Sequence, residues 1–375
     1  MTDLQDTPAA EVIVAGHICL DVIPEVNAGA ANLRPGILVE AGSTVFSTGG
    51  AVANTGLALH RLGIKVRLAG KIGDDIFGQG VLNILRGHNP DLTESMVVSS
   101  DESTSYSIII SPPGTDRMFI HSPGANASFV SVDVSNIVLS GCRLLHFGYP
   151  PLMQAMSAGG GKELQDLFKR ARSLGLATSL DLSMPDMSGP SGQVHWPDFL
   201  RGILPLTDVF LPSFDELLVM LGPEIPFHLK HKLNKEDRIS QDLVAWLADW
   251  SINAGAAIVA IKTGSQGLYA RTAGIDRVGN INGIRLNKIA DWTDQQAWAP
   301  CFVTTVVGTT GSGDATIAGF LMALIKEMTF DEALQAACAV GACSVEASDA
   351  VSGIKSWPET RERIQSGWPQ LPNIG

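Results

Sequence analysis

The sequence predicts an α/β fold built on a mostly parallel central sheet, and two observations indicate it. Short apolar, β-branched runs bounded by turn residues recur along the chain, as is typical of strands buried on both faces. Stretches with helical spacing of apolar residues separate them, and such alternation places helices on both faces of a parallel sheet. Strands are expected at 11–16, 65–73, 142–148, 177–183, 208–213 and 256–264. Helices are expected at 54–63, 161–175, 214–222 and 240–255.

Two stretches, 20–48 and 103–122, interrupt this alternation because they have strand-like character without intervening helices. In the second, "SYSIII" and "MFIHS" flank "PPGTDR", a pattern that predicts a hairpin. We therefore expect a single domain over residues 1–375, in which these segments form a small β-sheet inserted in the α/β core. Ligands of parallel sheets bind at the carboxyl ends of the strands. The small sheet is expected to act as a lid over that edge.

Composition excludes several classes of function. The 375 residues carry a formal net charge of -12 with a pI of about 5.1, which argues against a nucleic-acid partner. Five widely spaced cysteines indicate free thiols in a reducing compartment. The N-terminus has no basic region followed by an apolar run, so no signal peptide is expected. The longest apolar helical stretch, 316–325, is too short to span a bilayer. We expect a cytoplasmic protein with no membrane partner.

The stretch "GTTGSGD" (308–314) runs directly into a helical pattern that is expected to begin near Ala315. Gly311 and Gly313 permit a tight turn whose N–H groups face outward. A turn at the positive end of a helix is suited to bind phosphate. Asp314 follows at once, and its residue type allows two roles. It could cap the helix, or it could accept the proton of a hydroxyl that attacks phosphorus.

Three motifs together resemble those of a known family. "TTGSGDATIAGF" (309–320) resembles the C-terminal signature of the ribokinase-like PfkB carbohydrate kinases. "STGGAVANTGLALHRLG" (47–63) and "GKIGDDIFG" (70–78) resemble the N-terminal signature. Further matches follow in the family's order, so the resemblance covers about residues 12–365. It implies a three-layer αβα ribokinase-like fold and ATP-dependent phosphorylation of a sugar hydroxyl.

The resemblance also assigns roles to positions of this chain. Asp314 matches the catalytic base, and the turn before it matches an anion hole for the transferring phosphoryl group. The anion hole comprises Gly311, Ser312 and Gly313. The sugar site comprises Asp21, Gly49, Gly50, Asn54, Asn126 and Tyr149. The ATP site comprises Ser213, Glu216, Lys262, Gly264, Ser265 and Gly267. Glu216 is also expected to organise Mg²⁺ through water.

Three departures from the family pattern leave alternatives open. Ser213 stands where the family has asparagine, and "DLSMPD" (181–186) lacks the usual D-P-N-x-R. Gly308 replaces an aspartate that helps many relatives to hold a monovalent cation, which argues against potassium activation. The acceptor could be a nucleoside instead of a sugar, or the chain could be a non-catalytic sensor of sugar or nucleotide. Because lid sheets of this kind often pair between subunits, a homodimer through the lid is a further expectation.

Overall fold

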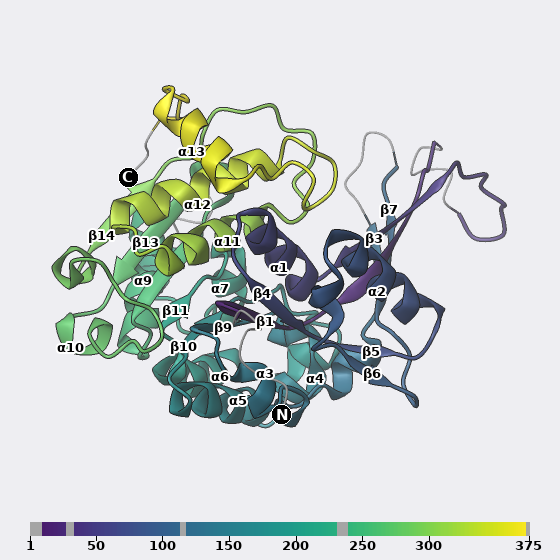
Figure 1. Cartoon of the computed structure of the whole chain (residues 1–375), viewed down its shortest axis with the longest axis horizontal. Coiled ribbons are helices and arrows are strands. Elements are labelled where there is room, and N and C mark those ends of the chain that lie inside the picture. The colour runs from purple at the N-terminus through teal and green to yellow at the C-terminus, as the bar shows by residue number, and fades with distance from the viewer. Residues whose placement is uncertain (1–9, 28–33, 113–117, 231–238, 373–375) are drawn as a thin grey trace, which may run out of the picture.

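The computed structural model describes residues 10–27, 34–112, 118–230 and 239–372. Its largest sheet has eight strands in the order β14-β13-β12-β11-β10-β9-β1-β4 (Figure 1). Six of them are parallel: β1 (Val12–Gly16), β4 (Val66–Ala69), β9 (Leu144–Gly148), β10 (Ala177–Leu180), β11 (Val209–Phe210) and β12 (Ile258–Lys262). β13 (Leu268–Thr272) pairs antiparallel with β12, and β14 (Gln296–Ala299) pairs antiparallel with β13 at one edge of the sheet. The predicted mostly parallel α/β fold is confirmed.

Helices lie on both sides of this sheet. The longer helices are α1 (Ala51–Arg61), α2 (Ile76–His88), α5 (Lys162–Ser173), α6 (Trp196–Ile203), α9 (Gln241–Asn253), α11 (Ser312–Ile325), α12 (Phe330–Ser344) and α13 (Trp357–Gln365). The shorter helices are α3 (Asn136–Leu139), α4 (Gln154–Ser157), α7 (Phe214–Met220), α8 (Phe227–Lys230) and α10 (Ile275–Val278).

The alternation of side chains along β1 produces two apolar cores, one on each face of the sheet. Val12 and Val14 belong to one core, which contains residues of α1, α2, α11 and α12. Ile13 and Ala15 point to the other, which contains residues of α5, α6, α7 and α9. The central strands are therefore covered on both faces, as their continuous apolar sequences require.

A second sheet of four strands, which we call the small sheet, projects from the body beside α2 (Figure 1). Its order is β3-β2-β7-β8, with β2 (Cys19–Pro24), β3 (Thr44–Gly49), β7 (Tyr106–Ile110) and β8 (Met118–Ser122). The expected hairpin corresponds to the antiparallel pair β7 and β8. Its turn, 113–117, lies outside the described residues. That this sheet acts as a lid stays a prediction.

The structure divides one expected strand in two. The stretch 65–73 was expected to be continuous, but Gly70 interrupts it. β4 lies in the main sheet, whereas β5 (Lys71–Gly73) pairs with β6 (Val97–Ser99) in a separate ribbon. A Cβ atom at residue 70 would lie 2.7 Å from Cγ2 of Ile18, so this crossing requires glycine. The bend directs the chain away from the main sheet.

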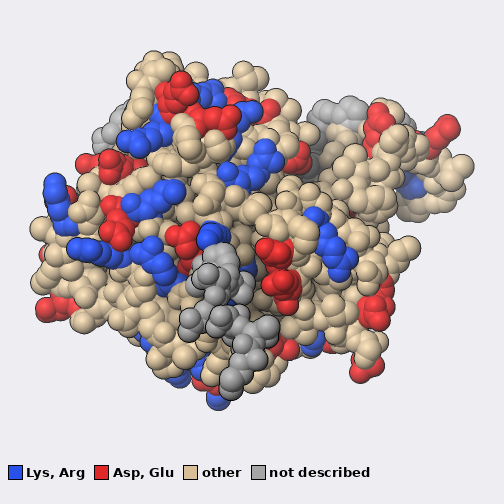
Figure 2. Space-filling model, in the orientation of Figure 1, with Lys and Arg blue, Asp and Glu red and all other residues tan. Residues whose placement is uncertain are grey.

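Three features of the structure concern charge, membrane spans and cysteines. On the face shown in Figure 2, acidic and basic side chains are interspersed. Within the described ranges, no helix is long and apolar enough to cross a membrane. All five cysteines are free thiols.

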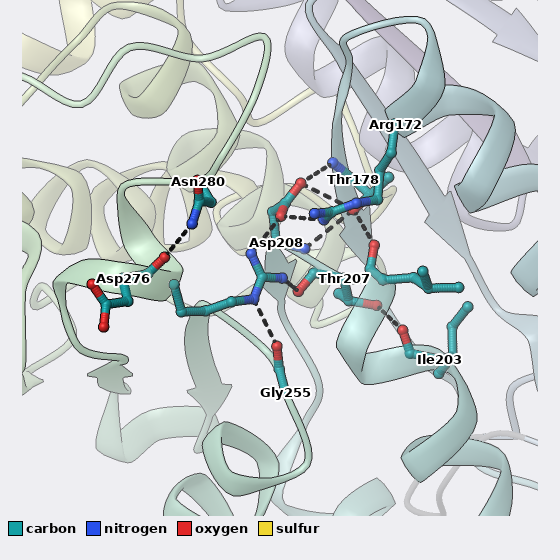
Figure 3. A network of polar contacts seen from close by, with 10 residues as sticks. Arg172, Thr178, Ile203, Thr207, Asp208, Gly255, Asp276 and Asn280 are labelled. Atoms are coloured by element: carbon teal, nitrogen blue, oxygen red, sulfur yellow. Dashed lines mark hydrogen bonds and ion pairs between the residues drawn. The ribbon is translucent and has the colours of Figure 1, made fainter.

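An ionic network ties together the amino-terminal edge of the main sheet (Figure 3). Asp208, which precedes β11 and is 1% exposed, accepts hydrogen bonds from Arg172 at 2.6 Å and from Arg277 at 2.8 Å. Its second carboxylate oxygen accepts from the amide and hydroxyl of Thr178. Arg277 also donates to the carbonyl of Gly255, just before β12. The network therefore joins three neighbouring segments at the edge opposite the carboxyl ends of the strands.

Candidate active site

Helix α11 begins in the predicted glycine turn, three residues earlier than expected. Gly311 precedes it with φ of 71°, a left-handed conformation that favours glycine. A Cβ atom there would lie 2.4 Å from Cβ of Ala350, so the close packing of the neighbouring loop also requires glycine. Ser312 and Gly313 form the first turn of the helix, whose N–H groups and dipole favour an anion.

Asp314 lies in that first turn, is only 3% exposed, and is held by three donors from elsewhere in the chain. Asn54 donates to Oδ2 at 3.1 Å and Thr55 to Oδ1 at 3.1 Å, both from α1. The phenol of Tyr149, just after β9, donates to Oδ2 at 2.8 Å. Burial raises the pKa of Asp314, although these three donors and the charge of Lys262 oppose the rise. The carboxylate is thus oriented and more basic than usual.

An acidic cavity of about 450 Å³ opens beside Asp314 and α11. Carboxylates of Asp181, Asp215 and Glu216 line it together with Asp314. The ammonium of Lys262, also in its lining, donates to Asp181 at 2.6 Å and to the carbonyl of Leu211 at 2.6 Å. Burial disfavours the charged form of Lys262, but Asp181 and Glu216 outweigh it and raise its pKa. Lys262 therefore stays a cation close to the helix N-terminus.

An apolar cavity of about 350 Å³ adjoins the acidic one. The two share Lys262, Gly264, Ser312 and Gly313 as lining residues. Ser265 and Gly267 line only the apolar side. The backbone turns sharply here, because Gly264 and Gly267 have φ of 59° and 101°. A ligand whose planar apolar ring lies in this cavity would have its polar end directed to the turn before Asp314.

Asp21 and the two glycines before α1 meet at the base of the small sheet. A Cβ atom on Gly49 would lie 2.4 Å from Oδ2 of Asp21, so glycine at this position allows the carboxylate to lie where it does. Gly50 has φ of 87°, and a Cβ atom there would lie 2.5 Å from Nδ1 of His17. Burial raises the pKa of Asp21 to about 6. A third cavity of about 530 Å³, which we call the sheet cavity, includes Asp21 and Asn54 in its lining.

Ser213 and Glu216 have a structural role, and their predicted roles in binding ATP and Mg²⁺ stay predictions. They form a capping box at the start of α7, in which the Ser213 amide donates to Glu216 at 2.7 Å and the Glu216 amide donates to Ser213 Oγ at 3.3 Å. Both residues still line the acidic cavity. No group of three or more potential metal ligands occurs within the described part of the chain. A single oriented carboxylate fits Mg²⁺ that is held mainly by water and phosphate, as this ion prefers.

The structure leaves no space at position 308 for the aspartate side chain that Gly308 replaces. A Cβ atom there would lie 2.9 Å from the carbonyl oxygen of Ala347 and 3.0 Å from Cα of Ser348. The amides of Val307 and Gly308 both donate to the carbonyl of Val345, which holds this loop close. On this backbone there is no space for a cation-binding side chain, and we derive no catalytic step through a monovalent cation.

The structure brings most predicted site residues to one edge of the main sheet, but it uses Asn126 differently. The fully buried Asn126 amide donates to the carbonyl of Ile18 at 2.8 Å and accepts from its amide at 3.3 Å. It therefore supports the segment between β1 and β2, and contact with a substrate stays a prediction. Sequence reasoning missed Thr55 and Asp181 as partners of the site. Asn54, which precedes Thr55, and the stretch "DLSMPD", which begins with Asp181, were noted, but the bonds join segments more than 80 residues apart.

The chain matches known proteins over nearly its whole length. Residues 9–357 match the model of the pfkB family carbohydrate kinase. Probable fructokinase-7 of Arabidopsis thaliana is 24% identical over 372 residues, which cover 96% of this chain and 95% of that protein. The 2-dehydro-3-deoxygluconokinase of Bacillus subtilis is also 24% identical, over 86% of this chain and 87% of that protein.

Solved structures share the fold at low sequence identity. The ribokinase of Thermotoga maritima has a TM-score of 0.70 at 19% identity, over 95% of this chain and 99% of that one. The Arabidopsis thaliana ribokinase complexed with ribose and ATP has a TM-score of 0.70 at 16% identity, over 94% and 98%. The family match covers well over half of the chain, and it agrees with the fold that the solved structures share. The chain belongs to the pfkB family of carbohydrate kinases, enzymes that transfer a phosphoryl group to a hydroxyl group.

Proposed function

We propose that the protein phosphorylates a hydroxyl group of a small polyol with ATP, with Asp314 as the general base. The observation that carries this proposal is the position of Asp314. Its carboxylate is buried, has a raised pKa and lies in the first turn of the helix that would receive the phosphoryl group. A base so placed can take the proton of an attacking hydroxyl while the helix N-terminus stabilises charge on phosphorus.

ATP would bind across the two adjoining cavities. The apolar cavity suits the adenine ring of ATP. The residues that this cavity shares with the acidic cavity would direct the phosphates toward Gly311–Gly313. Lys262 is the cation that would bind the phosphates. Its ammonium, which donates to Asp181, would then donate to a phosphate oxygen as well. Glu216 would hold Mg²⁺ through water, and the ion supplies charge neutralisation on the phosphate oxygens when bound.

The acceptor would bind between the small sheet and α1. Asp21 can accept hydroxyl hydrogens there. Asn54 donates to Asp314, and its Oδ1 is buried and has no hydrogen-bond partner within the described residues. Buried polar atoms almost always have a partner, so an acceptor hydroxyl is the natural donor to Oδ1. Closure of the small sheet over the acceptor would exclude water and so suppress hydrolysis of ATP.

A nucleoside acceptor is a second candidate, and one observation favours it. The sheet cavity extends outward from Asp21 and Asn54 between apolar side chains of Ile23, Val45 and Ile109. These could cover a nucleobase while the ribose lies beside Asp314. ADP production with a panel of sugars and nucleosides distinguishes the two candidates.

Replacement of Asp314 by Asn tests the proposed base. We expect kcat to fall at least about 100-fold, since a general base typically contributes that much or more. Binding of ATP and acceptor, measured by calorimetry, should change little because the amide retains the shape of the carboxylate. The exposed Asp198→Asn variant is the matched control and should keep full activity. An unchanged kcat in Asp314→Asn would contradict the mechanism.

A further inference from the structure

The imidazole of His17 is buried next to the proposed acceptor site and has no hydrogen-bond partner among the described residues. It follows β1 directly, is 2% exposed, and neither ring nitrogen has a hydrogen-bond partner among the residues that the structure describes. Its carbonyl accepts from the amide of Val52 in the first turn of α1, which fixes the backbone. Gly50 leaves room for the ring, because a Cβ atom there would lie 2.5 Å from Nδ1. A ligand is the missing partner that this geometry suggests.

The His17 ring has two aromatic neighbours, one from the body and one from the small sheet. Its centroid lies 6.2 Å from that of Tyr149, whose phenol donates to Asp314. It also lies 5.2 Å from the ring of His121 on β8, at the more exposed edge of the small sheet. The pair thus has one imidazole on the body and one on the small sheet.

His121 belongs to a polar row that crosses the small sheet. The strand register aligns Ser47 with Asp21, Asp21 with Ser107, and Ser107 with His121, so all four side chains share one face. Ser107 Oγ and His121 Nδ1 are 3.0 Å apart, which fixes the imidazole on this face of the sheet. The same face therefore presents hydroxyl, carboxylate and imidazole groups, a combination that binds hydroxyl groups.

The charge in and around this row opposes a negatively charged acceptor. Asp21 belongs to the row, and Asp314 lies on the other side of the proposed acceptor site. The strands of the small sheet contain no lysine or arginine over their described residues. Arg61 lines the sheet cavity, but its guanidinium donates to the carbonyls of Ile354 and Ser352. Lys262 is bonded to Asp181.

The imidazoles themselves add little positive charge. Burial, together with the neighbouring His121, lowers the pKa of His17 to about 3, so that it is neutral at physiological pH. Burial also lowers the pKa of His121, which favours its neutral form as well. Over the described residues of the small sheet and the sheet cavity, no free lysine or arginine would offset the two carboxylates that a carboxylate or phosphate on the acceptor would meet.

We propose that His17 and His121 together recognise hydroxyl groups of the acceptor and that the enzyme selects an uncharged polyol, a sugar or nucleoside, against sugar acids and sugar phosphates. This inference rests on the proposed function, because it assumes that the acceptor binds between Asp21 and Asp314. It adds two specificity-determining residues that were absent from the sequence prediction, and it names the charge class of the substrate.

Steady-state kinetics with His17→Phe, His121→Phe and the conservative His17→Asn test the pair. We expect the acceptor KM to rise about 2- to 10-fold in each Phe variant, the range for loss of one neutral hydrogen bond, with the KM for ATP unchanged. His17→Asn should recover part of the loss. The exposed His195→Asn is the matched control. An acceptor KM that stays unchanged in both Phe variants overturns the role of the pair.

A substrate comparison tests the charge class without any variant. D-fructose, D-ribose and adenosine are compared with gluconate, 2-dehydro-3-deoxygluconate and fructose 6-phosphate. Higher kcat/KM for the charged group overturns the inference while leaving Asp314 as the base. If no compound is phosphorylated, the proposed function fails. Acceptor binding is then measured by calorimetry in the presence of a non-hydrolysable ATP analogue. Binding of the neutral polyols alone supports the inference. Binding of the acids alone, or of no compound, overturns it.

Discussion

At the scale of single residues, Tyr149 controls how strongly Asp314 holds its proton. Its phenol donates to Asp314 Oδ2 at 2.8 Å, and this bond lowers a pKa that burial raises. In Tyr149→Phe the pKa of Asp314 should rise further. Activity is lost as pH falls through that pKa, so the acid limb of the kcat/KM profile should move to higher pH. Tyr269→Phe, whose hydroxyl has no partner among the described residues, is the control. A limb that stays in place, or moves down, would refute the link.

At the scale of elements, the loop before α11 is packed too closely for a side chain at position 308. The amide of Gly308 donates to Val345, and the carbonyl of Ala347 occupies the space that a side chain would need. We therefore expect replacement of sodium by potassium at constant ionic strength to leave kcat unchanged. Activity assays in the two salts, with choline chloride as the reference, check this. Selective activation by potassium would show that the carbonyls of this loop bind the ion without a carboxylate.

At the scale of the whole molecule, the Asp208 network holds the edge of the sheet that faces away from the active site. Asp208→Asn leaves Arg172 and Arg277 without their carboxylate, and loss of one partner from such a buried ionic group costs about 3–5 kcal/mol. Urea denaturation should show a loss of that order in the free energy of unfolding. Activity per folded molecule should stay the same, because the network lies at the opposite ends of the strands. The control is Asp198→Asn, and a loss no larger than its own would mean that the network contributes little.

The homodimer expected through the small sheet stays a prediction. Val45, Phe46, Phe119 and Ile120 are each more than half exposed on this sheet. Light scattering of the purified protein would determine the oligomeric state.

The sequence by itself determined the fold class, the family and the position of the proposed base. Strand–helix alternation and the motif "TTGSGDATIAGF" are local patterns, in which each residue's role depends on neighbours within a few positions. The glycine turn could be located from the sequence for the same reason. The division of 65–73 at Gly70 was missed because the close packing of Gly70 against Ile18 is not local.

Only the tertiary structure decided which side chains surround that base and what they bind. Thr55 and Tyr149 donate to Asp314 from 259 and 165 residues away in the sequence. Lys262 donates to Asp181, which is 81 residues away. His17 showed no signal in the sequence, since a histidine after a strand has no preferred role. Its missing partners became visible only when burial and the register of the small sheet placed it between Tyr149 and His121. Hydrogen bonds and burial depend on distances in space, which a local pattern does not contain.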